Sequence, residues 1–337
     1  MKVTGPHSDV VISSRVRLAR NLQQLPFPGQ ASNEALQEAF KQIKEVAEKR
    51  LEQKGFVFSA IDRHPARQRK LLVEKHLISP AMAAPGTSRA VIINQEETVS
   101  IMVNEEDHLR LQCILSGLSL EDAWQRMDEL DDLLEEDLTY AFSEKRGYLT
   151  TCPTNIGTGL RASVMVHLPA LDMVERSEQI LSTISQLGLA VRGLYGEGTG
   201  AAANIYQLSN QVTLGQREEE IIENLTGVTG QIIDQEQSAR EFLLREKKDD
   251  LRDRIMRSFG VLKYAHQISS QEAMKLLSDV RLGIDLGLIE DLESSILSEL
   301  MVLIRPAFLQ QLEGEELSAS ERDLRRAALI RKRMRLD

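Results

Sequence analysis

The apolar residues of this chain recur at helical spacing in some stretches and at strand spacing in others. Residues 32–54 carry apolar side chains every three or four positions behind a Ser-Asn pair that can cap a helix, which predicts a helix there. The short apolar runs at 91–94 and 99–105 predict strands. A capping-box pattern at Ser119 predicts a second helix that reaches about Phe142.

Residues 147–211 contain four short apolar runs separated by turns rich in glycine and asparagine. The runs read YLTTC, RASVMVHL, LAVRGLY and ANIYQL, and each predicts a strand. The strand–helix–strand alternation that is typical of parallel sheets is missing from this stretch. The expected fold class is therefore α+β, with an antiparallel β-sheet flanked by helices.

The last third of the chain has a helical pattern throughout, and capping boxes at Ser269 and Ser318 start two of its predicted helices. A cluster of glycines at 215–232 marks the change of pattern. We therefore expect a catalytic α+β domain over residues 1–225 and an all-α C-terminal domain over residues 226–337. Two hydrophobic helical hairpins in the last third are predicted to pair two subunits, so the expected assembly is a homodimer.

Composition and charge exclude two classes of function. Aromatic residues make up 4% of the 337 residues, too few for a platform on which nucleic-acid bases stack. The formal net charge is −10, whereas a protein that neutralises nucleic-acid phosphates is normally basic, so no direct nucleic-acid binding is expected.

Cys113 and Cys152 cannot form a disulfide framework and are expected to stay reduced. We see no signal-peptide pattern and no apolar run of membrane length, so we expect a cytoplasmic protein without a membrane partner.

Several arginines lie in extended or turn contexts, where they can converge on one ligand. Arg15 and Arg17 are two residues apart, so on a strand both point to one face. Arg161 opens the run RASVM, Arg192 opens RGLYGE, and Arg110 ends the acidic run NEEDHLR. A guanidinium group is a planar fork that holds two oxygens and stays charged, so several of them suit a triphosphate. The alternative is that each arginine forms a surface ion pair.

Acidic and glycine-rich segments stand beside these arginines. The polar residues 104–108 directly follow the apolar run VSIMV, so they are expected at the edge of a cleft. Glu197 lies in the loop RGLYGEGTG, whose glycines let a backbone approach a ligand closely, although a flexible hairpin has the same composition. The sequence has no G-x-x-x-x-G-K-[ST] run, which excludes a Walker-type phosphate site.

Four blocks occur in order along the chain: SSRVRLARN at 13–21, NEEDHLR at 104–110, CPTNIGTGLRASV at 152–164 and RGLYGE at 192–197. Together they resemble the phosphagen (guanidino) kinase family, which contains the arginine and creatine kinases, over about residues 8–225. The resemblance implies a glutamine-synthetase-like catalytic domain and the cofactors ATP and Mg²⁺. In that family the nucleotide phosphates chiefly hold the Mg²⁺, so no protein metal ligands are expected.

The resemblance also implies a nucleotide site, with five arginines as the phosphate ligands and a histidine from LVEKHL nearby. The implied ATP-binding residues are Ser13, Ser14, Arg15, Val16, Arg17, His76, Arg110, Arg161, Ala162, Ser163, Val164, Met165, Arg192, Gly193, Leu194, Tyr195 and Gly196.

The implied acceptor site consists of two carboxylates and a thiol. Glu106 and Glu197 match the pair that grips the guanidinium group, and Cys152 matches the cysteine beside it. A guanidinium has a pKa above ~12, so a carboxylate must orient it and take a proton before its nitrogen attacks. We assign Glu106 as the base and Glu197 as the co-aligning group, and expect the Cys152 thiol to tune the guanidine's environment. The alternative for Cys152 is a small apolar filler, and His108 and His167 are expected to have structural parts.

Two departures point to one branch of the family. The block SSRVR begins at residue 13, which leaves no room for the helical N-terminal domain of the small-molecule kinases, and Tyr195 stands where those enzymes commonly have an arginine. The resemblance is therefore closest to the bacterial protein-arginine kinases. It implies transfer of the ATP γ-phosphoryl group to arginine side chains of proteins. In that branch the phosphorylation directs substrate proteins to a Clp-type protease and inactivates a stress-response repressor, and an activator protein is a further implied partner. The alternatives are a kinase for free arginine or another small guanidine, and a non-catalytic phosphoarginine reader.

The run RDxxRA supports the same branch. Arg322 and Arg326 are four residues apart on a predicted helix, with Asp323 alongside. Bases for a phosphate and an acid for a guanidine would together bind phosphoarginine. The run resembles the phosphoarginine-binding motif of the protein-arginine kinases, which is tied to allosteric control. The alternative is an ordinary basic end of a helix.

Overall fold

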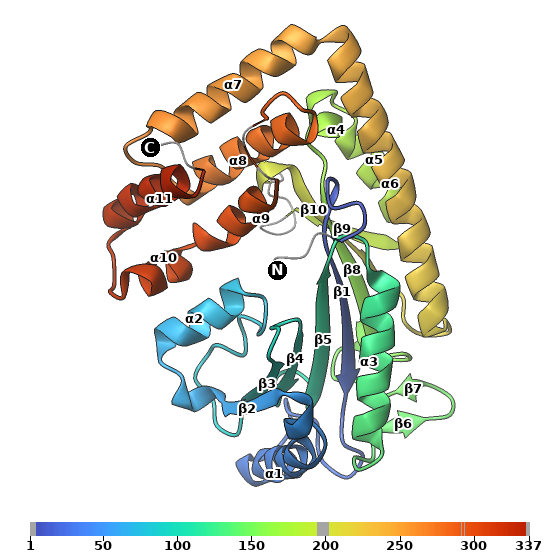
Figure 1. The fold of residues 1–337 in the computed structure, drawn as a ribbon. Coiled ribbons are helices and arrows are strands. Elements are labelled where there is room, and N and C mark those ends of the chain that lie inside the picture. Colours follow the sequence, from blue (N-terminus) through green and yellow to red (C-terminus); the bar gives the residue numbers. More distant parts are fainter. Residues whose placement is uncertain (1–4, 194–201, 291, 293, 335–337) are drawn as a thin grey trace.

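The computed structural model describes residues 5–193, 202–290, 292 and 294–334, and its centre is an eight-stranded sheet with the strand order β2-β3-β4-β5-β1-β8-β10-β9 (Figure 1). The strands are β1 (Val11–Arg20), β2 (Phe56–Ala60), β3 (Ala90–Asn94), β4 (Val99–Val103), β5 (Leu109–Ser116), β8 (Leu160–His167), β9 (Leu189–Gly193) and β10 (Ile205–Asn210), and a separate hairpin is formed by β6 (Phe142–Ser143) and β7 (Gly147–Tyr148). Every neighbouring pair in the large sheet is antiparallel. The predicted α+β class with an antiparallel sheet is confirmed.

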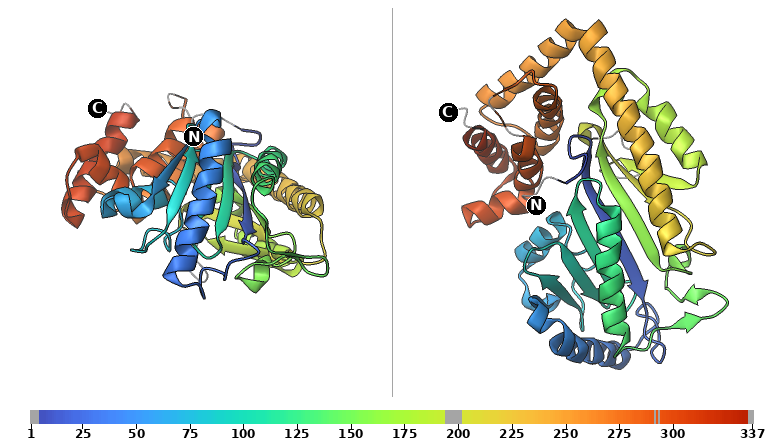
Figure 2. Two further views of the ribbon diagram at one scale, coloured as in Figure 1. Left: turned by 90° about the horizontal axis from the view of Figure 1, so that it is seen from below. Right: turned by 45° about the vertical axis from the view of Figure 1, so that its right-hand side comes forward.

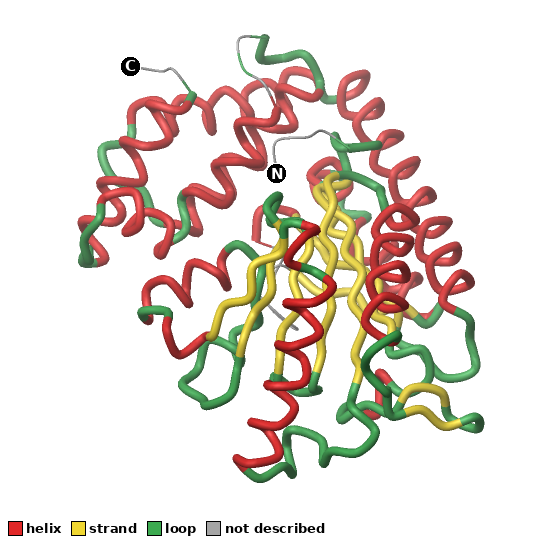
Figure 3. Tube along the Cα trace, turned by 60° about the horizontal axis from the view of Figure 1, so that its bottom comes forward, coloured by secondary structure: helices red, strands yellow, loops and turns green. Residues whose placement is uncertain are grey.

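Helices cover one face of the sheet and form the rest of the molecule (Figure 2). They are α1 (Asn33–Arg50), α2 (Ala66–Glu74), α3 (Leu120–Glu135), α4 (Pro169–Met173), α5 (Ser177–Gln186), α6 (Glu218–Glu246), α7 (Lys248–Tyr264), α8 (Ser270–Asp285), α9 (Ser294–Leu303), α10 (Pro306–Glu313) and α11 (Ala319–Arg333), with short 3₁₀ helices η1 (Glu52–Lys54), η2 (Ile61–Arg63), η3 (Pro153–Asn155) and η4 (Ala202–Asn204). Helix α3 packs on β1 and β5, and α6 packs on β8 and β10. Helices α7 to α11, which Figure 1 labels, gather beyond one end of the strands, and Figure 3 shows the same arrangement from another side. In the described part of the chain no helix is both long and apolar enough to cross a membrane.

The two faces of the sheet differ because side chains alternate along each strand. On β1, Val16 and Leu18 are fully buried in the main hydrophobic core, under the helices. Arg15 and Arg17 point to the opposite face, which we call the polar face. A smaller apolar cluster around Met102 lies on the polar face near β3 and β4 and packs under the α2 segment. The remaining part of the polar face lies over β5, β1, β8 and β10 and carries Arg15 and Arg17.

The predicted helices exist, but one is shorter than expected. Helix α1 begins after Ser32, whose Oγ accepts a hydrogen bond from the Ala35 N–H at 3.3 Å. Helix α3 ends at Glu135, and Phe142 lies in β6, so the predicted extension to Phe142 is wrong. The polypeptide leaves the helix because the following segment forms an antiparallel bridge from Tyr140 to Leu22, which lies two residues beyond the end of β1.

The predicted strands of residues 147–211 need two corrections. Of the run YLTTC only Tyr148 belongs to a strand, since the Thr151 N–H is bound by the Asp107 carboxylate at 2.7 Å instead of a neighbouring strand. Helices α4 and α5 lie between β8 and β9, where only turns were expected. Leu181 and Ile184 of α5 are buried three residues apart, which is helical spacing that the short apolar runs concealed.

Helix α6 joins the two regions of the chain. It runs unbroken for 29 residues, so the expected division between residues 225 and 226 falls inside it. It contacts α3 and the strands β8 and β10 of the sheet, and it also packs against α4 and α7. Both halves bury apolar side chains, for example Ile222 and Ile233. Helix α6 is thus shared by the sheet and by the helical region.

Candidate active site

Five arginines from strands β1, β5, β8 and β9 lie on the polar face. Arg15 and Arg17 alternate with core residues of β1 and so point the same way. The antiparallel register places Arg161 of β8 directly opposite Arg17. Arg110 of β5 and Arg192 of β9 occupy positions of the same face on either side of this pair. The strand register therefore brings together all five arginines that the sequence singled out.

The electrostatics of this cluster show concentrated positive charge. The pKa of Arg15 is lowered to about 10 by burial and by the charges of Arg110 and Arg161. Burial and the neighbouring arginines likewise lower the pKa of Arg17 and of Arg161. The Nε atoms of Arg17 and Arg161 are buried without a hydrogen-bond partner in the described structure. A face with this much positive charge suits an anion that carries several charges, such as a polyphosphate.

Neutral polar side chains on the same face fix the direction of two guanidinium groups. Arg15 donates from Nε to the Ser163 hydroxyl at 3.3 Å and from Nη2 to the Gln207 side-chain oxygen at 3.1 Å. Arg161 donates from Nη2 to the Ser209 hydroxyl at 3.4 Å. We did not expect Gln207 and Ser209 from the sequence. Their signal is the polar alternation in the run YQLSN, which continues the pattern of the arginine strands.

The other described residues of the expected ATP-binding set divide between the two faces of the sheet. Ser13, Ser163 and Met165 share the polar face with the arginines, and Gly193 ends β9 beside them. The side chains that point to the helix-covered face are those of Ser14, Val16, Ala162 and Val164, which are buried. Ser14 there donates to the Gly117 carbonyl at 2.8 Å. These four side chains pack in the interior and do not meet the arginine cluster.

His76 lies above the cluster on the segment that follows α2. Its carbonyl accepts a hydrogen bond from the Gln112 side chain at 2.6 Å, and Gln112 is opposite Arg17 in the sheet. The His76 backbone has a φ of 60°, the left-handed region. Burial, the charge of Arg305 and the charge of Arg15 lower the pKa of the imidazole to about 4. The ring is thus neutral near pH 7 and close to the arginines, and Gln112 is a further residue that sequence reasoning missed.

The acidic segment forms a tight turn between β4 and β5. Asn104 has a φ of 54° and donates from its side chain to the carbonyls of Leu36 and Ser88, at 2.9 and 2.7 Å. Asp107 is buried and accepts from the Asn21 side chain at 2.6 Å. These bonds hold the turn between them and leave Glu106 exposed at its tip.

The two glutamates of this turn have different environments. Glu105 accepts from Ser79 at 2.5 Å and from Arg110 at 2.8 Å, which helps to lower its pKa against the opposing effect of burial. The pKa of Glu106 is raised by partial desolvation and by the neighbouring carboxylates Asp107 and Glu105. A carboxylate with a raised pKa is a better proton acceptor at neutral pH. The Glu105–Arg110 ion pair was not expected from the sequence.

Cys152 lies next to the acidic turn. The residue before it, Thr151, donates its N–H to Asp107 at 2.7 Å, which fastens the cysteine loop to the turn. The half-buried thiol lies 3.0 Å from the Thr154 hydroxyl and is close enough to Arg161 to influence the pKa of that arginine. The structure therefore brings Glu106, Cys152 and the arginine cluster to one edge of the polar face. His108 and His167, by contrast, are buried, and their rings form hydrogen bonds inside the protein.

Four residues of the expected site lie outside the described residues: Leu194, Tyr195, Gly196 and Glu197. Arg192 and Gly193 precede them at the end of β9.

The RDxxRA run lies on α11, which begins with the predicted capping box between Ser318 and Glu321. Asp323 and Arg326 form an ion pair, as the helical spacing suggests. Arg326 is only 2% exposed, and it also donates to the carbonyls of Ile304 and Ile268 at 2.9 and 2.8 Å. Arg322, which is half-buried, donates to a carbonyl that precedes the helix. The motif residues are adjacent, and the donors of Arg326 are directed into the protein.

Comparison with known proteins places this fold and site in a class. The model of the ATP:guanido phosphotransferase C-terminal catalytic domain matches residues 35–239. The chain belongs to the ATP:guanido phosphotransferase family, and it is an ATP-dependent phosphotransferase. A second model, the protein-arginine kinase McsB C-terminal domain, matches residues 248–337. The family resemblance of the sequence blocks is thereby confirmed.

The relatives give the particular branch. The protein-arginine kinase of Halothermothrix orenii is 55% identical over 332 residues, which cover 98% of this chain and 95% of that protein. The protein-arginine kinase of Bacillus subtilis is 50% identical over 339 residues, covering 100% of this chain and 93% of that protein. Among solved structures, a lombricine kinase superposes with a TM-score of 0.62 at 26% identity, over 68% of this chain and 67% of that one. The substrate-free duplicated taurocyamine kinase of Schistosoma mansoni has the same fold, with a TM-score of 0.62 at 20% identity over 93% of this chain and 48% of that one.

Proposed function

We propose that the protein transfers the γ-phosphoryl group of ATP to arginine side chains of other proteins. The observation that carries the proposal is the cluster of five arginines on the polar face, with the Glu106 turn and the Cys152 loop fastened together at its edge. The relatives that match this chain over nearly its whole length are protein-arginine kinases, which supports a protein as the phosphoryl acceptor.

The arginine cluster binds and neutralises the nucleotide phosphates in this proposal. The transferring phosphoryl group carries its charge on peripheral oxygens, so catalysis depends on alignment and on fixed positive charge. Arg15, Arg17 and Arg161 supply that charge from rigid strands, which hold the guanidinium groups in place before the nucleotide arrives. ATP brings Mg²⁺ on its own phosphate oxygens, and the ion adds further positive charge.

Glu106 prepares the acceptor. The planar guanidinium of a substrate arginine lies against the carboxylate, which accepts one of its protons. The freed nitrogen then forms a bond to the γ-phosphorus, the bond from that phosphorus to the β–γ bridging oxygen breaks, and ADP leaves with the electron pair. Glu197 is the second aligning carboxylate of the proposal, and the Cys152 thiol tunes the environment of the guanidine. Cys152→Ala is expected to keep residual activity.

The helical region has a regulatory part in the proposal. Arg322, Asp323 and Arg326 form a phosphoarginine site that controls the kinase. The adjacency of Asp323 and Arg326 on α11 supports this assignment, because a bound phosphoarginine offers a phosphate to the bases and a guanidine to the acid. A kinase core over residues 1–225 and a helical part over residues 226–337 remain the proposed functional units, joined through α6.

The wider setting follows from the family resemblance. The proposal includes a Clp-type protease that receives the phosphorylated proteins, a stress-response repressor among the substrates, an activator protein and a homodimeric assembly. An enzyme that consumes ATP works where ATP is made available, so the proposal places it in the cytoplasm.

One assay tests the proposed activity. The protein is incubated with Mg-ATP and either an arginine-rich protein or free arginine, and acid-labile, base-stable phosphate is measured on each acceptor. We expect label on the protein acceptor, loss of most of it with Glu106→Gln, and full labelling with the control Glu96→Gln, which removes an exposed carboxylate from the β3–β4 turn.

Other outcomes select other functions. Label on free arginine alone means a small-guanidine kinase. Phosphoarginine binding without label on either acceptor means a non-catalytic reader. Equal turnover by the two Gln variants contradicts the role of Glu106.

A further inference from the structure

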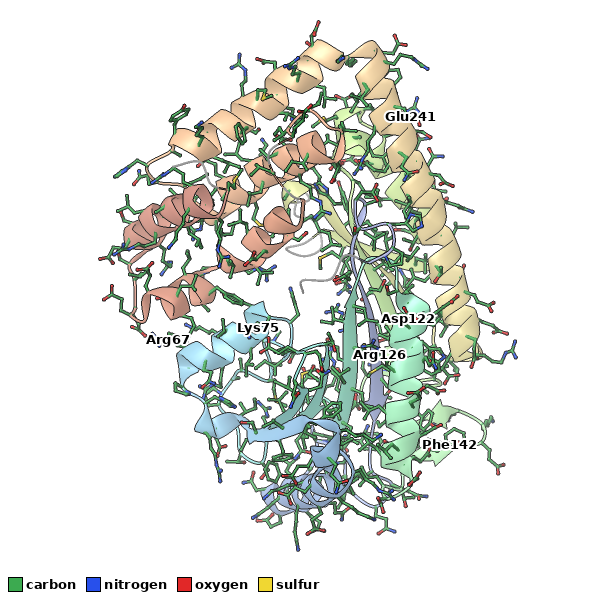
Figure 4. The ribbon with its side chains drawn as sticks, viewed as in Figure 1. Arg67, Lys75, Asp122, Arg126, Phe142 and Glu241 are labelled. Carbon is green, nitrogen blue, oxygen red and sulfur yellow. The ribbon has the colours of Figure 1, made fainter. Side chains whose placement is uncertain are left out.

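The segment Ile304–Phe308 connects α9 to α10 and contacts both the nucleotide site and the RDxxRA helix. Helix α10, which this segment begins, packs against α2. Figures 1 and 4 show the two helices facing each other, with α2 marked by Arg67 and Lys75 in Figure 4. Because α2 leads directly into His76, this contact joins the C-terminal region to the nucleotide site.

Glu74, the last residue of α2, caps the first turn of α10 from outside. Its two carboxylate oxygens accept the N–H groups of Ala307 and Phe308, each at 2.9 Å. These N–H groups have no partner within their own helix, and a negative charge at a helix N-terminus is favourable. Helix α10 otherwise starts without a side-chain cap, since its N-cap residue is Arg305. Glu74 is therefore the cap of a helix that lies more than 230 residues further along the chain.

Arg305 makes the second contact. Its Nη1 lies 3.5 Å from the His76 Nε2, while its Nε donates to the Met301 carbonyl at 3.3 Å. The charged groups that face the imidazole are Arg305 from the C-terminal region and Arg15 from β1. Lys75, the neighbour of His76 in the chain, is bound to Glu97 at 2.6 Å.

The conformation of His76 needs such support. Its φ of 60° lies in the left-handed region, which a residue with a side chain keeps only when its surroundings fix it. The His76 N–H bonds the Val73 carbonyl at 2.9 Å, and the His76 carbonyl accepts from Gln112 at 2.6 Å. Glu74 holds the helix end two residues before this point, and Arg305 meets the ring.

The segment is also held from its other side. Arg326 of the RDxxRA run donates to the Ile304 carbonyl at 2.9 Å, one residue before Arg305. The same five-residue segment is thus fastened to α2 by Glu74 and to α11 by Arg326.

We propose that Glu74 and Arg305 are positioning residues of the nucleotide site: they hold His76 against Gln112 and the phosphate-binding arginines, so that ATP affinity depends on the C-terminal helical region. This inference rests on the proposed nucleotide-binding function of the polar face. Glu74 and Arg305 act through His76, and neither takes part in the phosphoryl transfer.

The test compares Glu74→Gln and Arg305→Met with two matched controls. Glu97→Gln removes an exposed carboxylate that binds the adjacent Lys75, and Arg333→Met removes an exposed arginine of α11 that pairs with Glu299. Affinity for a non-hydrolysable Mg-ATP analogue is measured by calorimetry without an acceptor. We expect the dissociation constant to rise about tenfold in both test variants, which is the effect of losing about one charge-assisted hydrogen bond, and to stay unchanged in both controls. In the kinase assay the KM for ATP rises and kcat stays close to that of the parent.

A spectroscopic measurement separates positioning from a general structural role. The His76 imidazole is followed by NMR as a function of pH. In the parent it titrates far below the ordinary histidine range, near the pKa of about 4 that burial and the two arginines impose. Arg305→Met removes one of these charges, so the pKa rises, while Arg305→Lys keeps the charge and restores the low value.

Test variants that match the controls in nucleotide affinity and in the His76 titration overturn the inference. If Glu74→Gln does not fold, the Arg305→Met and Arg305→Lys pair decides by the same two measurements. Failure of the proposed function gives a different result, because an unaltered protein that binds the analogue and yet phosphorylates no arginine refutes the function and leaves the positioning measurements valid.

Discussion

Replacing Arg17 by methionine is expected to stabilise the ligand-free protein while weakening its binding of ATP. Arg17 is directly opposite Arg161 in the sheet, and Arg15 and Arg110 also act on its charge. Its pKa is lowered by burial and by these neighbours, which means that the folded protein disfavours the charge that the guanidinium carries. Methionine keeps a similar unbranched shape without the charge.

The magnitude follows from the strand geometry. Residues directly opposite on antiparallel strands have Cβ atoms ~5 Å apart, which brings their charged groups to roughly 6 Å. Two unit charges at this separation repel by about 3 kcal/mol at an effective dielectric constant of ~20. Solvent near the partly exposed side chains reduces this value, so we expect a gain of about 1–2 kcal/mol in the free energy of unfolding, or about 1–3 °C in Tm for a chain of this length. ATP loses one charge-assisted phosphate contact, which costs about 1.5–3 kcal/mol, or roughly 10- to 100-fold in Kd.

The assay is thermal unfolding of the parent and of Arg17→Met, with and without Mg-ATP, together with calorimetric titration of the nucleotide. Arg126→Met is the control, because Arg126 is an exposed arginine of α3 on the other side of the sheet (Figure 4). The control should change neither Tm nor nucleotide affinity. The parent should gain more Tm from Mg-ATP than Arg17→Met does, since ligand stabilisation follows affinity.

A lower Tm of ligand-free Arg17→Met would refute the reasoning, because it would mean that Arg17 contributes more through its contacts than it costs through repulsion. Equal ATP affinity of variant and parent would refute the assignment of Arg17 to the phosphates.

Three further predictions concern other residues. Arg20→Met is expected to lower the free energy of unfolding by about 3–5 kcal/mol in a urea titration, because it leaves the buried Asp131 carboxylate without its partner. The Arg20 guanidinium binds that carboxylate at 2.6 Å and lies 3.5 Å over the Tyr148 ring. The value of kcat/KM is expected to fall at acid pH as Glu106 takes up a proton. The fall should occur above pH 4.5, the ordinary pKa of a glutamate, because the pKa of this carboxyl is raised, and Glu106→Gln is expected to abolish it. Asp323→Asn is expected to weaken phosphoarginine binding at least about fivefold in a calorimetric titration and to spare ATP binding, since it removes the acid that a bound guanidine needs.

Each of these predictions has a matched control and a contradicting result. The control Lys49→Met breaks an exposed ion pair with Asp137 and should lower the free energy of unfolding by less than about 1 kcal/mol. If Arg20→Met lowers it by no more than this control, the argument from the burial of Asp131 is contradicted. The control Glu96→Gln should keep the fall of kcat/KM at acid pH. If Glu106→Gln keeps the same fall, the titrating group is not Glu106. Glu316→Gln removes an exposed acid near α11, and phosphoarginine affinity as high in Asp323→Asn as in this control contradicts the pocket.

The sheet could be predicted from the sequence because alternation along a strand is a local property. The apolar residues Val16 and Leu18 of β1 define the core face, and the same alternation places Arg15 and Arg17 together on the other face. The family blocks added the arginines of the other strands. The pairing of Arg17 with Arg161 depends on strand register, and the sequence spacing of two residues 144 positions apart does not reveal that register.

The rest of the site depends on contacts between distant segments. Gln112 belongs to the site because the His76 segment lies above it, and Arg305 reaches His76 because α10 packs beside α2. The burial of Arg326 also lacks a local signal, because its partners are backbone carbonyls of other helices and any residue offers a carbonyl. Helix α5 was missed since its apolar positions are few and lie within a stretch of short strands.

Because α6 is continuous, the number of its residues fixes the direction in which the side chains of its two halves point relative to each other. Each residue of an α-helix turns the chain by about 100°, so inserting or deleting a single residue near the middle of α6 would rotate everything beyond it by that angle. Ile222 and Ile233 lie in different halves of the helix and could then no longer both face inward. The buried side chains of one half would turn to solvent while those of the other half stayed in place. We expect length changes between relatives to be confined to the loops and this helix to keep a fixed number of residues.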